Sequence, residues 1–200
     1  MQFVDDIAEL ETLYGEPGSA SLRKVAHKMT PQYRKWIMAS RFCVVSTVGE
    51  DGADGSPRGD DGPVVQELDD HHLLLPDWRG NNRMDTLRNI VADGRIALMF
   101  FVPGNNNVIR VNGEGRVTLD DELRQRFEFK GKLPRSVIVI KIDEIYSQCA
   151  RALMRADLWG GADAPDIPTA GELLAEQTAG VEGGAEYDAA WGDRAAKTMW

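Results

Sequence analysis

Six apolar, β-branched runs dominate the middle of the chain, and the connections between them leave little room for helices. These runs cover residues 42–48, 64–68, 72–76, 95–102, 107–117 and 136–149. Between these runs the sequence predicts a helix at about 82–91 and suggests a further short helix at 119–129. Parallel strands would need a crossover of about a dozen or more residues at each step. The sequence therefore predicts a mainly antiparallel sheet, and closure into a small barrel would remove its exposed edges.

Helical patterns flank this predicted sheet. Thr30 followed by Pro31 is typical of a helix start, with a capping residue and proline at the first helical position. A chain of 200 residues usually builds one core. We therefore expect an N-terminal helical segment over 1–40 packed on the barrel, a barrel domain over 41–160, and a C-terminal extension over 161–200.

Composition and charge exclude several classes of protein. The formal net charge of −9 argues against general binding to nucleic acid or anionic membranes. The first residues, MQFVDDIAELE, do not resemble a signal peptide, and no apolar run approaches membrane-spanning length. We therefore expect a cytoplasmic protein. Cys43 lies in an apolar run and is expected in the core, and the His71–His72 pair is more typical of a solvated hairpin turn than of a metal site.

The polar turn in LLLPDWRGNNRMDTL (73–87) is the strongest candidate for a binding site. An apolar run stops at Pro76, and a helix-like pattern follows the turn. Helix N-terminal N–H groups, amide side chains and arginine together favour a phosphate site. Pairing of the arginines with Asp77 and Asp85 explains the turn equally well. No GxGxxG and no GxxxxGK[ST] occurs, so this phosphate would not belong to a P-loop or to a doubly wound dinucleotide domain.

The ordered set SPRGD, LLLPDWRGNNRMDTLRNI, RIALMFFVPG, IRVNGEGRV and CARALMRADLW resembles the pyridoxamine 5'-phosphate oxidase-related family of FMN-binding split barrels. The resemblance covers about residues 35–160. It implies a mainly β fold with flanking helices, built on a six-stranded antiparallel split β-barrel. It also implies a homodimer with FMN in each of two grooves at the subunit interface. The spacing of the cysteines and histidines gives no reason to expect a metal site.

The resemblance further implies which residues hold the cofactor. Arg58 with the adjacent backbone at Gly59 would hold the flavin ring and ribityl chain, and Pro76 and Asp77 would contact the ribityl region. The implied phosphate contacts come from the turn and are Arg79, Asn82 and Arg83, and Asn81 of the same turn is a further cofactor-binding candidate.

Four more residues carry alternatives. Arg110 is implied as a weaker phosphate or flavin contact, and an outward-facing barrel arginine explains it equally well. Cys149, Arg151 and Arg155 are implied at the mouth of the flavin pocket or at the dimer seam, where a helix end packing on its partner is the alternative.

The function that this resemblance implies is an FMN-dependent oxidoreductase, which exchanges a hydride through flavin N5 with a small substrate or a reduced nicotinamide. The tail around Trp191 and Arg194 lacks the spacing expected of pyridoxamine phosphate oxidation itself. A non-catalytic flavin or haem carrier or sensor is the alternative from another class. A barrel without a cofactor is a third. The sequence names no catalytic residue, substrate or electron donor, and does not distinguish FMN from a deazaflavin.

Overall fold

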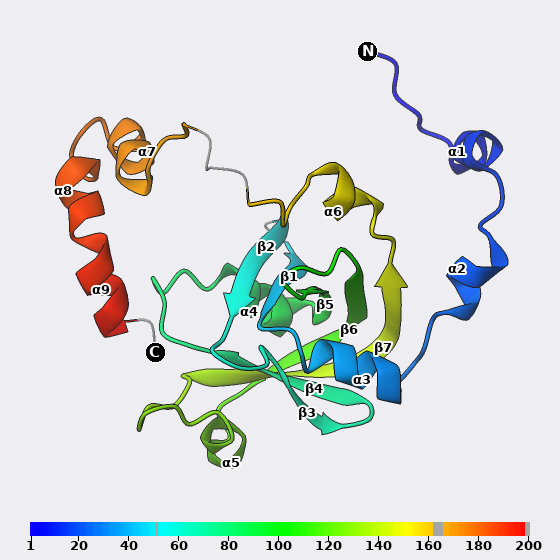
Figure 1. Ribbon diagram of the computed structural model, residues 1–200, viewed down its shortest axis with the longest axis horizontal. Coiled ribbons are helices and arrows are strands. Elements are labelled where there is room, and N and C mark those ends of the chain that lie inside the picture. The colour runs from blue at the N-terminus through cyan, green and yellow to red at the C-terminus, as the bar shows by residue number, and fades with distance from the viewer. Residues whose placement is uncertain (51, 162–165, 199–200) are drawn as a thin grey trace.

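The computed structural model describes residues 1–50, 52–161 and 166–198, and its centre is one antiparallel sheet. The sheet has seven strands in the order β2-β1-β5-β6-β7-β4-β3 (Figure 1). The strands are β1 Phe42–Gly49, β2 Gly52–Gly59, β3 Gln66–Asp69, β4 His72–Asp77, β5 Arg95–Phe101, β6 Val108–Thr118 and β7 Ser136–Gln148. Every neighbouring pair is antiparallel, as the short connections predicted.

The expectation of a closed six-stranded barrel is wrong in two respects. The glycine-rich segment after β1 forms strand β2, which pairs with β1 from Phe42↔Gly59 to Gly49↔Gly52. Glycine and proline are depleted in strands, but an edge strand tolerates both, which is why the sequence pattern missed β2. The sheet is also open, because β2 and β3 end it on either side and no pairing between them occurs in the described part of the chain.

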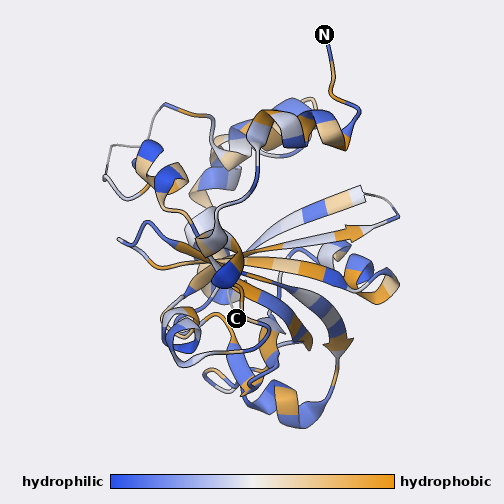
Figure 2. Ribbon diagram, turned by 90° about the vertical axis from the view of Figure 1, so that its right-hand side faces the viewer, coloured by the Kyte–Doolittle hydropathy of each residue, from blue (hydrophilic) through white to orange (hydrophobic). Residues whose placement is uncertain are grey.

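The core lies on the inner face of this curled sheet. Alternate residues of β1 and β5 are buried, as Cys43 and Val45 of β1 show, whereas β4 buries four consecutive residues. The hydrophobic residues gather along the strands (Figure 2). The largest fully buried side chains are Phe100, Ile37, Leu73, Leu74, Leu75, Leu98, Ile138, Ile140, Ile145, Val45, Val64 and Val65. The predicted burial of Cys43 is confirmed, and burial raises the pKa of its thiol to about 12.

Two helices pack against the sheet and complete its core. Helix α3 (Pro31–Ile37) begins as predicted, with the Thr30 hydroxyl accepting the N–H of Tyr33 at 3.4 Å. Helix α4 (Asp85–Ala92) lies along β1 and buries Ile90. Before α3, Ala26 pairs with Ile145 of β7, so this part of the N-terminal segment adds to the sheet.

The remaining helices are peripheral. They are α1 Ile7–Tyr14, α2 Ser19–Arg23, α5 Asp121–Gln125, α6 Arg151–Arg155, α7 Ala170–Gln177, α8 Gly184–Ala189 and α9 Trp191–Thr198. Helix α1 buries no residue, and α7 to α9 stand away from the strands on the opposite side of the view (Figure 1). None of the helices that the structure describes combines the length and the hydropathy needed to cross a membrane.

Candidate functional site

The sheet is open along one side of β4, and this opening positions the candidate site. Strand β3 pairs with β4 only as far as Gln66↔Leu74, so the end of β4 at Asp77 lacks a neighbour on that side among the described strands. Edge strand β2 faces it there. Arg58 Nη1 of β2 lies 2.6 Å from Asp77 Oδ1 of β4, and the two side chains are 20% and 15% exposed. This largely buried ion pair spans the opening.

A cavity lies beside this ion pair, and both Arg58 and Asp77 belong to its lining. It has a volume of ≈ 370 Å³, and we call it the β2–α4 cavity. Its lining consists of Ser56, Arg58, Asp77, Trp78, Gly80, Asn81, Asn82, Arg83, Met84, Thr86, Leu87, Val117, Leu119, Arg135 and Ser136. Five residues that the sequence singled out, Arg58, Asp77, Asn81, Asn82 and Arg83, thus meet at one cavity.

Arg79 lies elsewhere. It lines a smaller cavity of ≈ 190 Å³ together with Gly59 and Pro76, and only Arg58, Trp78 and Gly80 line both cavities. We call this second space the Arg79 cavity. The two arginines of the turn therefore line separate, adjoining cavities, and the expected phosphate clamp of Arg79, Asn82 and Arg83 stays a prediction.

The turn itself differs from the predicted helix start. Helix α4 begins at Asp85, and Met84 precedes it without a side-chain cap. Asn82 instead adopts a left-handed backbone conformation with φ of 63°, which asparagine tolerates better than most residues. Asn81 Oδ1 accepts the backbone N–H of Arg83 at 3.0 Å, a local turn that mimics a backbone bend. The two asparagines therefore shape the turn, and neither caps the helix.

Arg83 is both a cavity residue and half of an ion pair. Its Nε donates to Asp85 Oδ2 at 2.5 Å, and its side chain is 79% exposed. This hydrogen bond raises the pKa of Arg83. The alternative that the arginines pair with local aspartates is thus realised between Arg83 and Asp85, whereas Asp77 pairs with Arg58.

The lining also includes Arg135 and Ser136, which the sequence did not single out. Ser136 begins β7 and Arg135 directly precedes it, and the register Asp77↔Ser136 brings both to the cavity. Arg135 Nη1 donates to Asn82 Oδ1 at 2.6 Å, and its backbone N–H donates to the Asp77 carbonyl at 3.0 Å. A basic residue directly before a predicted strand was the only sequence signal. Arg135 reaches Asp77 through strand pairing between segments 58 to 59 residues apart in the chain, which no local pattern reveals.

Arg58 has one polar atom that lacks a partner. Its Nε is buried and has no hydrogen-bond acceptor among the described residues. A buried donor without an acceptor is costly, and such groups frequently mark functional sites. Since Arg58 lines both cavities, this orphan donor lies where a ligand acceptor could satisfy it.

Arg110 lies outside both cavities. It pairs with Met99 near the start of β6, whereas Val117 near the end of that strand lines the β2–α4 cavity. Its guanidinium carbon is 5.2 Å from the centre of the Tyr146 ring, and its Nε is buried without an acceptor in the part of the chain that the structure describes. Arg110 therefore shares the outer face of the sheet with Met99 and Tyr146.

Cys149, Arg151 and Arg155 are exposed where β7 ends and α6 follows. They line neither cavity. Helix α6 is held through Leu153, which is buried, and not through its arginines.

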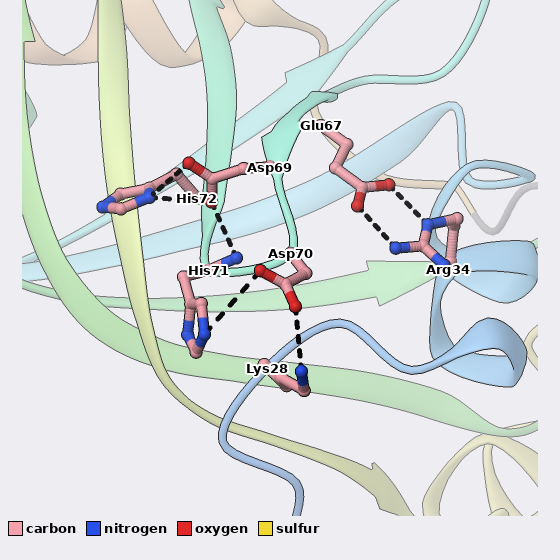
Figure 3. Close-up of polar contacts among 7 residues, drawn as sticks. All are labelled: Lys28, Arg34, Glu67, Asp69, Asp70, His71 and His72. Carbon is pink, nitrogen blue, oxygen red and sulfur yellow. Dashed lines mark hydrogen bonds and ion pairs between the residues drawn. The ribbon is translucent and has the colours of Figure 1, made fainter.

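The two adjacent histidines belong to a network of ion pairs at the β3–β4 turn (Figure 3). His72 Nδ1 lies 2.9 Å from Asp69, and this hydrogen bond lowers the pKa of the Asp69 carboxyl. Lys28 Nζ donates to Asp70 at 2.9 Å. Arg34 binds Glu67 through two hydrogen bonds of 2.6 and 2.7 Å. The network ties the N-terminal segment to the hairpin and lies apart from the β2–α4 cavity.

The fold and the cavity together define an open antiparallel β-sheet protein with a basic cavity at its split side. Residues 29–149 match the sequence model described as pyridoxamine 5'-phosphate oxidase, and the chain belongs to this family.

Several solved structures are similar to this chain. HupZ of Group A Streptococcus is 18% identical, with a TM-score of 0.50, over 68% of this chain and 99% of that chain. General Stress Protein 26 from Bacillus anthracis is 18% identical, with a TM-score of 0.45, over 57% of this chain and 88% of its own. An FMN-binding protein from Syntrophomonas wolfei is 18% identical, with a TM-score of 0.44, over 58% and 88%. No curated protein matches the chain. At 18% identity the likeness to HupZ concerns the fold alone.

Proposed function

We propose that this protein binds FMN in the β2–α4 cavity and is an FMN-dependent oxidoreductase. The single observation that carries the proposal is the orphan Nε of Arg58, a buried donor on a side chain that lines a basic cavity, with no acceptor among the described residues. A flavin ring offers carbonyl oxygens and ring nitrogens as acceptors for such a donor. Membership of the pyridoxamine 5'-phosphate oxidase family supports the same ligand.

The residues present also fit the rest of FMN. Three arginines line the cavity, Arg58, Arg83 and Arg135, against one lining carboxylate, Asp77, which favours an anion such as a phosphate ester. The walls include apolar side chains such as Leu87 and Val117, which suit a flat aromatic ring. Gly59, Pro76 and Arg79 belong to the neighbouring Arg79 cavity, so the proposal assigns them no phosphate contact.

The chemistry of this proposal comes from the cofactor, because bound FMN would exchange a hydride with a donor or a substrate. The protein residues would bind and orient it. Arg58 beside the flavin ring would favour the reduced, anionic form of the ring through its positive charge. The tail supplies no residue to this cavity in the proposal, since Arg194 stacks on Tyr187 and Trp191 of the same tail, 4.0 and 5.6 Å from their ring centres.

A homodimer is part of the proposal. On the outer face of the sheet Val44, Met99, Arg110 and Tyr146 form one row, because they lie directly opposite one another on β1, β5, β6 and β7. The row is half-buried and mostly apolar, and α4 packs on the other face. The buried Nε of Arg110, which has no acceptor among the residues that the structure describes, gives this face a donor that a second copy could bind. Arg110 would reach a cofactor only through such a dimer.

The test is a titration of the purified protein with FMN, followed by fluorescence and visible absorbance. We expect saturable binding, and a large loss of affinity in Arg83→Ala, whereas Arg88→Ala is the matched control because Arg88 lies on α4 outside the cavity lining. Addition of NADH or NADPH without oxygen should then bleach the bound flavin. Sedimentation should give the mass of a dimer.

Other outcomes point to the alternatives. Bound flavin that neither nicotinamide reduces would favour a flavin carrier or sensor. A haem spectrum, or binding of a deazaflavin in place of FMN, would keep the cavity and change the cofactor. Protein that stays colourless at high FMN concentration would refute the proposal.

A further inference from the structure

We infer that Arg135 is the principal anion-binding side chain of the β2–α4 cavity and that it, with Arg83, holds the phosphate of the cofactor. This inference rests on the proposed function and adds to it a residue from a segment far along the chain from the basic turn. The geometry points to a clamp between the start of β7 and the turn before α4, and not to a clamp within that turn.

The backbone of Arg135 is fixed by the sheet. Its N–H donates to the carbonyl of Asp77 at 3.0 Å, and the next residue, Ser136, is paired with Asp77 in the β4–β7 ladder. The side chain therefore starts from a rigid strand end at the cavity. A cation on a strand end is better positioned for binding than one on a turn alone.

The ion pairs around the cavity single out this arginine. Arg58 is compensated by Asp77 at 2.6 Å, and Arg83 by Asp85 at 2.5 Å. The acceptor of Arg135 is the neutral Oδ1 of Asn82, at 2.6 Å, and no carboxylate lies within ion-pair distance of it in the described ranges. Of the three arginines that line the cavity, Arg135 alone thus keeps a charge that no described carboxylate compensates.

Asn82 orients Arg135 without neutralising it. The amide oxygen takes one of the five N–H donors of the guanidinium group, and the others stay available for phosphate oxygens. The left-handed backbone at Asn82, with φ of 63°, presents the side chain of this residue to Arg135. Because guanidinium binds phosphate through two parallel hydrogen bonds, an arginine oriented in this way suits a phosphate ester.

The experiment compares FMN with riboflavin, which lacks the phosphate, for the wild type and for Arg135→Gln. We expect the Kd for FMN to rise about 10- to 100-fold in Arg135→Gln, the loss of one or two charge-assisted hydrogen bonds. The Kd for riboflavin should stay unchanged. Arg135→Lys keeps the positive charge but not the planar guanidinium group, so its loss of FMN affinity should be several-fold smaller. Arg88→Gln and Arg79→Gln should match the wild type, since neither residue lines the cavity.

Three results would overturn the inference. Arg135→Gln could bind FMN as tightly as the wild type, or it could lose the same affinity for riboflavin as for FMN. Arg79→Gln could lose affinity for FMN in place of Arg135→Gln. Arg135 is exposed, so Arg135→Gln should fold, and its urea midpoint checks this. Binding of inorganic phosphate, followed by calorimetry, separates the two proposals. If the wild type binds phosphate through Arg135 but does not bind FMN, the cofactor proposal fails and Arg135 keeps its role. If Arg135→Gln binds phosphate as the wild type does, the inference fails.

Discussion

The Arg58–Asp77 ion pair links the two strands on either side of the open edge, and its removal should destabilise the protein measurably. The atoms are 2.6 Å apart, and the side chains retain 20% and 15% of their exposure. Water therefore screens this pair much less than a surface ion pair. Replacement of Asp77 by asparagine would leave Arg58 largely buried beside a neutral amide, with its Nε already lacking an acceptor.

The magnitude follows from the partial burial. Removal of one partner of a fully buried pair costs about 3–5 kcal/mol, and the remaining exposure here places the expected loss at the lower end, about 3 kcal/mol. Arg58→Met should cost a similar amount, because it leaves the Asp77 carboxylate unpaired. The double variant removes both charges, so its loss should be smaller than the sum of the single losses by about 2–3 kcal/mol.

Urea unfolding of the four proteins, without added cofactor, measures these quantities. The slope of the unfolding free energy against urea concentration should be the same in all four proteins. A constant slope indicates that the substitutions change stability and not the compactness of the native or the denatured state. Gln66→Ala on the opposite edge strand offers a comparison at a site without an ion pair. A loss below about 1 kcal/mol for Asp77→Asn, together with additive single variants, would refute the argument that this pair stabilises the open edge.

Two further predictions concern the sheet itself. Gly113→Ala should destabilise the protein by about 1–3 kcal/mol, because an added Cβ would lie 1.9 Å from the Lys141 carbonyl oxygen, next to the irregularity in the β6–β7 pairing. Gly55→Ala, with nothing within 4 Å of the added Cβ, should change the thermal midpoint little. In the folded protein at neutral pH, a thiol reagent should modify Cys149, which is exposed. Cys43 should react only on unfolding, because burial raises the pKa of its thiol to about 12. Labelling of both cysteines at equal rates would contradict the burial of Cys43.

Much of this fold could be predicted from local pattern. The alternation of apolar residues located six of the seven strands, and their short connections predicted antiparallel pairing. Thr30 and Pro31 gave the start of α3 correctly. Cys43 was expected in the core because of its apolar neighbours. The combination of short motifs also led to the correct family.

The site was predicted less completely. The sequence identified the basic turn and Arg58, but placed Arg79 and Arg83 together, whereas the structure separates them into two cavities. It offered no reason to choose Arg135, which reaches the cavity through the pairing of Asp77 with Ser136. Whether Arg110, Cys149, Arg151 and Arg155 contact a cofactor or a partner subunit stays a prediction.

The amino-acid sequence by itself determined where the strands form and which of their faces is apolar, because side-chain periodicity and helix capping act over a few residues. The tertiary structure alone decided that glycine-rich β2 pairs as an edge strand, that the sheet stays open beside β4, and that Arg58, Asp77 and Arg135 meet at that opening. These features depend on strand register between segments distant in the chain, and register is set by the packing of the whole sheet.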